Sequence, residues 1–260
     1  MTDLVERIDD GAVRVLRLNR PDARNALNMG LIKAVRAELA AVGPDNVRCL
    51  VITGNGKGFC AGADVKDWSE LAKTGVPEGY DWVSEMHGLI LDLHGLDTPV
   101  IAMINGAAVG AGLDMALACD FRFAAAEAKF RCAYTWVGFN PDAGGSWLMP
   151  RLMGLEAAKR FAFTGDIWSA EKAQAHGLVS EVHAGEELEV ATLTFARQLG
   201  EGPSVAIRQT KRLMERAAGN TLAQQLAAEQ EAGKICGATQ DHREALAAAV
   251  EKRNPVFKGL

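Results

Sequence analysis

The chain has 260 residues, which is long enough to bury one large hydrophobic core. Hydrophobic residues make up 48% and charged residues 23%, as in an ordinary globular protein, and the net charge is −5. The basic residues are scattered, which argues against nucleic-acid binding through a broad basic face. Binding through a local basic patch is the alternative that remains.

Cysteine usage and the N-terminus indicate the compartment. The five cysteines form no CxxC pair and are odd in number, which favours buried thiols in a reducing compartment over a disulfide framework. The first ten residues are acidic and lack the apolar core of a signal peptide. Residues 98–119 carry no basic side chain, but Asn105, Asp114 and several glycines make a membrane segment there costly. We therefore predict a cytoplasmic protein without a membrane span.

Hydrophobic periodicity predicts alternating strands and helices over the first 180 residues. The predicted strands cover residues 13–18, 49–53, 100–104 and 121–125. The predicted helices cover residues 29–42, 81–93 and 112–119, and a further helix with a loop occupies residues 65–80. This alternation predicts an α/β fold.

The pattern is almost wholly helical after about residue 185. The predicted helices there cover residues 186–199, 203–216, 221–236 and 240–251, and a proline-bearing tail follows. Helices that follow an α/β body suggest an assembly element. We therefore divide the chain into a core over 1–185 and a helical assembly region over 186–260.

Two glycine-rich turns each connect a predicted strand to a predicted helix. They are Gly58-Phe-Cys-Ala-Gly-Ala-Asp64 and Asn105-Gly-Ala-Ala-Val-Gly-Ala-Gly112. Free N–H groups at a helix N-terminus bind developing negative charge, so the two turns together could form an oxyanion hole. The alternative is that the glycines merely turn the chain. Neither segment is a phosphate loop, because GxxxxGK[ST] and a complete GxGxxG after a strand are both absent.

Further motifs accompany these turns. They are Asn19-Arg-Pro-Asp-Ala-Arg-Asn-Ala-Leu27, Pro141-Asp-Ala-Gly-Gly145, Pro150-Arg151, Thr164-Gly165, Ala170-Glu-Lys-Ala173 and Gly177-Leu-Val179. In this order, the segments resemble the crotonase (enoyl-CoA hydratase/isomerase) superfamily over essentially the whole chain. The resemblance implies a spiral of repeated ββα units and C-terminal helices that build a homotrimer or a dimer of trimers. It also implies an acyl-CoA thioester substrate, with no separate cofactor.

The resemblance further implies the site residues. The oxyanion donors of the family correspond to the backbone N–H groups of Ala63 and Ala111; glycine is common at the second position, and alanine keeps the N–H. The positions that correspond to CoA contacts are Arg24, Ala26, Leu27, Ala61, Asp64 and Val65. The tail residues Phe257 and Lys258 correspond to an element that reaches the CoA of a neighbouring subunit, although Lys258 could equally be a solvated terminal charge.

Two carboxylate positions bear on the reaction. Hydratases of the family use two glutamates to position and deprotonate water and to protonate the α-carbon. The first position is Asp114 here, one methylene shorter. The second is Tyr134, whose phenol, with a pKa of about 10, is a poor base at neutral pH. The resemblance therefore puts efficient hydration in doubt.

Asp142 offers a second carboxylate where hydratases usually have glycine. An acidic residue there resembles the dienoyl-CoA and epoxyphenylacetyl-CoA isomerase branches, and segments 142–151 and 252–257 look closest to the second. Dienoyl-CoA isomerases keep aspartate at position 114 but have glutamate in place of Tyr134, so the match is mixed. The alternatives are that Asp142 caps the following helix and that Asp114 is simply a buried, hydrogen-bonded aspartate.

An apolar pocket would raise the pKa of both aspartates. Trp136, Phe139 and Trp147 are candidate walls, and plain core packing is the alternative for them. The five histidines have no metal-binding spacing, so we expect no metal site. Cys60 has no histidine nearby in sequence to activate it as a nucleophile.

The sequence thus predicts a cofactor-free isomerase of an unsaturated or epoxy-aromatic acyl-CoA. The N–H groups of Ala63 and Ala111 stabilise the thioester enolate, and Asp142, assisted by Asp114, moves a proton. The first alternative is a hydratase that adds water across the 2,3 double bond, using Asp114 and a water held by Asp142 or Tyr134. The second is a CoA-ester-binding protein without catalysis, because resemblance of fold does not decide function.

Overall fold

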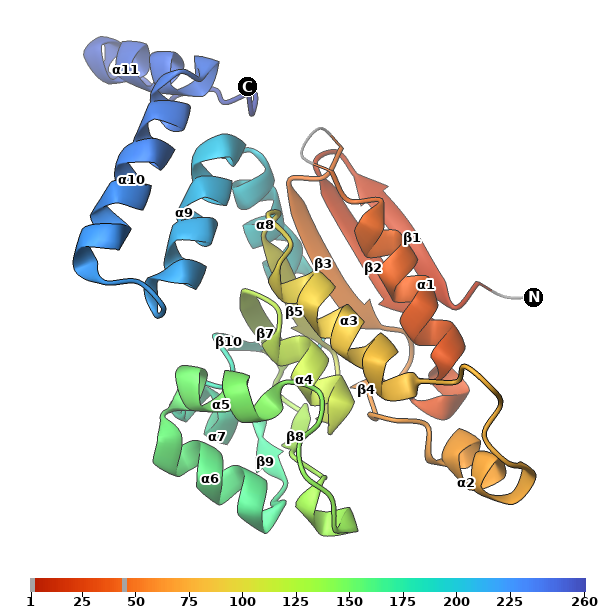
Figure 1. Ribbon diagram of the computed structural model, residues 1–260. Coiled ribbons are helices and arrows are strands. Elements are labelled where there is room, and N and C mark those ends of the chain that lie inside the picture. Colours follow the sequence, from red (N-terminus) through yellow and green to blue (C-terminus); the bar gives the residue numbers. More distant parts are fainter. Residues whose placement is uncertain (1–2, 44–45) are drawn as a thin grey trace.

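Two β-sheets form the centre of the molecule (Figure 1). The computed structural model describes residues 3–43 and 46–260, so the first two residues of the acidic N-terminus lie outside it. The six-stranded sheet has the order β1 (Val5–Asp10), β2 (Val13–Leu18), β3 (Cys49–Gly54), β5 (Val100–Ile104), β7 (Phe121–Ala125) and β10 (Glu181–His183). The four-stranded sheet has the order β4 (Gly58–Cys60), β6 (Ala107–Val109), β8 (Lys129–Arg131) and β9 (Trp168–Ser169). Both sheets are mixed, because β1 and β9 run antiparallel to their neighbours and the other pairs are parallel.

The chain repeats one ββα unit three times. Each unit places a strand in the six-stranded sheet, the next strand in the four-stranded sheet, and then helices. The units are β3, β4, α2 (Val65–Thr74) and α3 (Trp82–His94); β5, β6 and α4 (Ala111–Leu117); and β7, β8, the 3-10 helix η2 (Thr135–Val137) and α5 (Gly145–Met153). This confirms the predicted α/β spiral. Because β4 pairs with β6, the glycine turns that follow these two strands adjoin each other.

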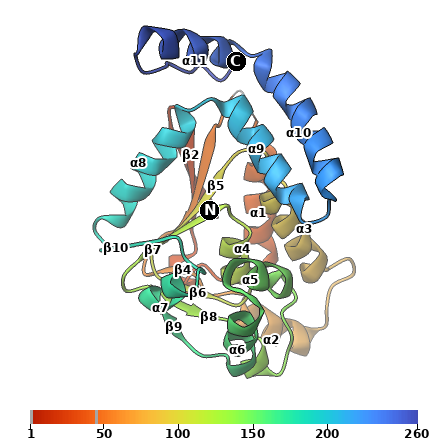
Figure 2. The ribbon, with the colours of Figure 1, turned by 90° about the vertical axis from the view of Figure 1, so that its left-hand side faces the viewer.

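The core lies on both faces of the six-stranded sheet. Every residue of β3 and β5 is buried, which explains their continuous apolar sequences. The helices α1 (Met29–Ala40) and α3 lie over one face, and α8 (Leu188–Gly200) lies over the other (Figure 2). The helices α6 (Leu155–Thr164) and α7 (Ala170–Ala175) lie beside the four-stranded sheet, and a short 3-10 helix, η1 (Pro21–Ala23), follows β2.

Three C-terminal helices extend away from the sheets (Figure 1). They are α9 (Ser204–Ala217), α10 (Leu222–Gly237) and α11 (Gln240–Glu251). Ion pairs tie α9 to the core, including one of 2.7 Å between Lys211 Nζ and Asp120 Oδ2. Large apolar side chains on these helices are nevertheless exposed: Met214, Leu222, Leu226, Ile235, Leu246 and Val250. The division of the chain at residue 185 stays a prediction.

Most predicted elements are present with small shifts at their ends. The segment 98–119 contains β5, β6 and α4, and no helix in the described ranges is long and apolar enough to cross a bilayer. The sequence patterns missed β1 and the short strands β4, β6, β8, β9 and β10. A strand of two or three residues is too short to display a period of two, and β1 exposes five of its six residues.

Candidate active site

The two predicted donors lie on adjoining turns. Asp64 N donates to Leu27 O, and Leu27 N donates to Gly62 O at 2.7 Å, which leaves the N–H of Ala63 between them unused. Ala111 is the first residue of α4, so its N–H has no partner within the helix. Neither N–H donates to an acceptor within residues 3–43 and 46–260. Both groups are thus free to bind an oxygen.

Glycine is required where the two turns approach each other. Gly62 has a φ of +89°, and a Cβ there would lie 2.7 Å from Val109 O and 3.6 Å from Ala111 N. Gly112 lies against Cys60, and a Cβ there would meet the Cys60 Sγ at 2.5 Å. Side chains at these positions would push the turns apart. The glycines therefore do more than reverse the chain, because they set the spacing of the two donors.

A cavity of about 380 Å³ opens beside these turns. It is lined by Ala61, Gly62, Ala63, Val65, Trp68, Trp82, Val109, Gly110, Ala111, Ala133, Tyr134, Val137, Phe139 and Asp142. Its wall is mainly apolar, and Trp82 is held by a 3.0 Å hydrogen bond from Nε1 to Leu27 O. The structure therefore brings Ala61, Ala63, Val65, Ala111, Tyr134 and Asp142 together around one cavity.

Asp114 is fully buried and does not line this cavity. The Tyr134 hydroxyl donates to Asp114 Oδ2 at 2.6 Å, and Oδ1 has no partner among the described residues. Burial is the main cause that raises the pKa of Asp114 to about 8, and the charge of Asp142 contributes to the rise, whereas the Tyr134 hydroxyl and the nearby Gly145 N–H oppose it. Burial and the charge of Asp114 also raise the pKa of Tyr134, so its phenol stays protonated. The Asp114–Tyr134 pair can hold a proton, but the Asp114 carboxyl itself has no direct access to the cavity.

Asp142 is half-buried on the cavity wall. Burial raises the pKa of its carboxyl, while its own backbone N–H and the charge of His87 oppose the shift. The helix that follows it has Gly144 as its N-cap, without any side-chain cap. The alternative that Asp142 caps this helix is therefore wrong. His87, which the sequence patterns missed, contacts the Asp142 backbone carbonyl through Nε2 at 2.7 Å.

The aromatic side chains that line the cavity differ from the predicted ones. Trp136, Phe139 and Trp147 are 70%, 53% and 44% exposed, so none is plain core. Only Phe139 lines the cavity, because Trp136 lies under the guanidinium of Arg131 and Trp147 under that of Arg151. The aromatic walls that the sequence patterns missed are Trp68 and Trp82, which meet edge to face with ring centroids 5.7 Å apart. The spacing of Trp68 and Trp82 in the sequence did not show that they line a cavity.

The segment around residues 24–27 supports the first turn. Arg24 and Asn25 both have a positive φ, and Ala61 N donates to Arg24 O at 3.0 Å. Ala26 O accepts a hydrogen bond from Arg20, which also forms a 2.8 Å ion pair with Asp64. Burial opposes ionisation of Asp64, but Arg20 and backbone N–H groups hold its pKa below the usual range. Asp64 also caps α2, so its carboxylate already has structural partners.

Cys60 and the chain tail lie outside the cavity lining. Cys60 is buried, its Sγ donates to Asn25 O, and burial raises the pKa of its thiol to about 12, which makes it a poor nucleophile. The main chain of Lys258 is held by Asp241 on α11 at 2.7 Å, and Phe257 is its half-buried neighbour. In Figure 1 the C-terminus lies at the opposite end of the molecule from α2. One chain alone therefore does not bring Lys258 to the cavity.

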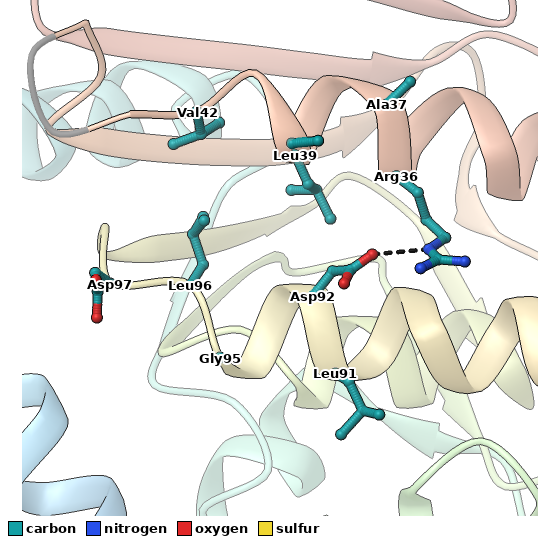
Figure 3. Close-up of a pocket in the computed structure, with 10 residues that line it drawn as sticks. Arg36, Ala37, Leu39, Val42, Leu91, Asp92, Gly95, Leu96 and Asp97 are labelled. Carbon is teal, nitrogen blue, oxygen red and sulfur yellow. Dashed lines mark hydrogen bonds and ion pairs between the residues drawn. The ribbon is translucent and has the colours of Figure 1, made fainter.

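A larger hollow of about 700 Å³ lies between α1 and α3 (Figure 3). Its three charged side chains all have partners, since Arg36 pairs with Asp92 at 2.7 Å and with Glu85 at 2.6 Å, and Asp97 pairs with Arg212. It contains none of the predicted site residues. We therefore place the candidate site in the smaller, apolar cavity. The described residues also form no cluster of three or more His, Cys, Asp or Glu side chains that could hold a metal ion.

The ββα spiral and its two free backbone donors above an apolar cavity define an α/β enzyme scaffold of the crotonase type. The model of the enoyl-CoA hydratase/isomerase family matches residues 9–260, and the chain belongs to this family. Family membership implies an acyl-CoA substrate.

Relatives with different activities are about equally similar to the chain. The 1,2-epoxyphenylacetyl-CoA isomerase of Escherichia coli is 35% identical over 261 residues, covering 100% of this chain and 99% of the relative. The crotonyl-CoA hydratase of Syntrophomonas wolfei is 35% identical over 245 residues, covering 94% and 93%. The crystal structure of an enoyl-CoA hydratase from Bacillus anthracis superposes with a TM-score of 0.92 at 33% identity, covering 99% and 100%. Overall identity therefore leaves hydratase and isomerase unresolved.

Proposed function

We propose that this protein is a cofactor-free isomerase of an unsaturated or epoxy-aromatic acyl-CoA. The observation that carries the proposal is that Asp142 lines the same cavity as the free N–H groups of Ala63 and Ala111. The second carboxylate of a hydratase is replaced by Tyr134, whose hydroxyl is engaged by Asp114. One accessible carboxylate beside an oxyanion hole is suited to moving a proton within the substrate.

The proposed reaction has two proton transfers. The thioester oxygen accepts hydrogen bonds from Ala63 and Ala111, which stabilise the enolate that forms when a proton leaves carbon. Asp142 accepts that proton and returns it to another carbon of the same acyl group, so the product has the composition of the substrate. The raised pKa of Asp142 brings it nearer to the value a general base needs at neutral pH. Asp114 acts only through Tyr134, by holding the phenol in place.

Hydration is the second candidate. The raised pKa of Asp114, about 8, and the similarity to a crotonyl-CoA hydratase favour it. The burial of Asp114 behind Tyr134 speaks against it, because water would have to reach a carboxyl that does not line the cavity. The third candidate is a protein that binds CoA esters without turnover.

A panel of enoyl-, dienoyl- and 1,2-epoxyphenylacetyl-CoA substrates tests the proposal. Isomerisation leaves the mass of the acyl-CoA unchanged and moves a bond that NMR locates, whereas hydration adds the mass of one water. Tight binding without turnover would favour the binding protein. A second assay follows the exchange of the α-protons of phenylacetyl-CoA in D₂O, which needs only enolate formation and a base.

We also propose how CoA and neighbouring subunits bind. The main chain of Arg24, Ala26 and Leu27 and the residues Ala61, Asp64 and Val65 would contact CoA. Exposed apolar side chains on α9–α11 support a homotrimer or a dimer of trimers, in which Phe257 and Lys258 would reach a neighbour's CoA. The five free cysteines suit a cytoplasmic enzyme.

A further inference from the structure

The loop that carries Asp142 has few hydrogen bonds to the rest of the protein. It runs from Gly138 to Gly144 and connects η2 to α5. At its start, Phe139 N donates to Tyr134 O at 2.9 Å, and at its end, Gly144 O accepts from the first turn of α5. For residues 140–143, the one hydrogen bond in the described structure that joins the main chain to another element is the 2.7 Å bond between His87 Nε2 and Asp142 O. Asp142 thus depends on one side chain for its polar anchor.

The anchor comes from a rigid element. His87 and Ile90 lie one turn apart on α3, a helix of 13 residues. Ile90 packs against the end of the loop, since its Cγ2 lies 3.2 Å from where a Cβ of Gly144 would be. The Asp142 carbonyl oxygen can only accept a hydrogen bond, so the Nε2 atom of His87 carries the proton and donates. One face of α3 therefore holds the loop by a hydrogen bond and by apolar contact.

We propose that His87 is a positioning residue that holds the Asp142 carboxylate at the reacting carbon. This inference rests on the proposed role of Asp142. The hydrogen bond fixes the backbone from which the carboxylate extends, and reacting groups must be held within about 0.5 Å of their productive geometry. A displacement of about 1 Å can cost about 100-fold in rate. His87 is exposed and does not line the cavity, so it would act through Asp142 and not on the substrate.

The charge of His87 is consistent with this arrangement. A positive charge on His87 opposes the rise in the pKa of Asp142 and contributes to the lowered pKa of Asp81, which lies at the start of the same helix. The hydrogen bond itself does not require that charge, because neutral imidazole can also carry its proton on Nε2. A substitution that removes the charge of His87 but keeps an N–H donor at the same reach therefore separates the effect of the hydrogen bond from that of the charge.

Three variants test the inference in the exchange of phenylacetyl-CoA α-protons with D₂O. His87→Ala removes the anchor, whereas His87→Gln keeps a neutral N–H donor at about the same reach. His94→Ala is the control on the same helix, because His94 pairs with Glu215 on α9 and packs on Trp147 of α5 but forms no hydrogen bond with the described loop 138–144. We expect His87→Ala to lower the maximal exchange rate about 10- to 100-fold with little change in the half-saturating concentration. His87→Gln should recover most of the rate, and His94→Ala should leave it unchanged.

Comparison with Asp142→Asn distinguishes a failure of the positioning role of His87 from a failure of the proposed function. If Asp142→Asn lowers exchange and His87→Ala does not, the role of His87 is refuted while the proposed base stands. Failure of His87→Gln to recover the rate, or an equal loss in His94→Ala, also refutes it. If the wild-type protein exchanges no α-proton, or Asp142→Asn exchanges at the wild-type rate, the proposed function fails and the inference fails with it. The melting temperature of each variant identifies a loss that comes from unfolding.

Discussion

Tyr134, which lines the cavity, donates its hydroxyl to the fully buried carboxyl of Asp114 at 2.6 Å. The two residues occupy the positions at which the resemblance to hydratases implies a pair of glutamates. Here the pair is a phenol and an aspartate bonded to each other, so neither is placed as a free carboxylate at the substrate. The accessible carboxylate is Asp142.

Asp142→Asn should lower isomerisation at least about 100-fold, because the amide cannot accept and return a proton. Its melting temperature should stay close to that of the wild type, since the side chain caps no helix. Steady-state kinetics and thermal melting measure both effects. Asp114→Asn is the companion variant. A loss confined to Asp114→Asn would favour the hydratase, and full activity in both variants would leave the carboxylate assignment without support.

Ala111→Pro should lower turnover about 10²- to 10³-fold by deleting one oxyanion donor. Proline suits this position otherwise, because Ala111 is the first residue of α4 and its N–H has no partner in the helix. Leu155→Pro at the first residue of α6, which also follows a glycine N-cap, is the control for the backbone change. Circular dichroism checks folding. A folded Ala111→Pro variant with wild-type turnover would rule out this donor.

The stability of the protein should depend on the titration of Asp114. Its pKa is raised to about 8 in the folded state, so the folded protein binds more protons than the unfolded chain between about pH 4 and pH 8. The free energy of unfolding therefore falls as the pH rises through this window. Asp114→Asn removes the titration, and urea denaturation should show the variant gaining stability relative to the wild type as the pH rises from 5 to about 8.5. A constant difference between the two proteins would contradict the raised pKa.

The C-terminal helices should assemble the protein. Exposed Leu226 and Ile235 on α10 would be buried in a trimer, so light scattering should give three times the mass of one chain, or a multiple of it. Glutamate at either position should weaken the assembly, because a charge would be buried without a partner. A monomer at micromolar concentration would remove this claim, and with it the proposed reach of Lys258 into a neighbour's site.

Local patterns in the sequence determined much of the scaffold. The apolar runs of β3 and β5, each followed by a glycine-rich segment, were enough to predict two glycine turns in an α/β fold. This succeeded because a buried parallel strand is apolar at every position and a turn of this kind needs glycine. Both properties can be recognised from residues that are consecutive in the sequence.

Only the tertiary structure decided which groups meet at the cavity. His87 contacts a loop 55 residues further along the chain, and Trp82 bonds to Leu27 over the same separation. The short strands of the second sheet, which bring the two turns together, have no period of their own. Likewise, nothing in the sequence near Asp114 shows that Tyr134 separates it from the cavity. Contacts of this kind arise from the packing of distant elements against one another, and that packing leaves no local pattern in the sequence.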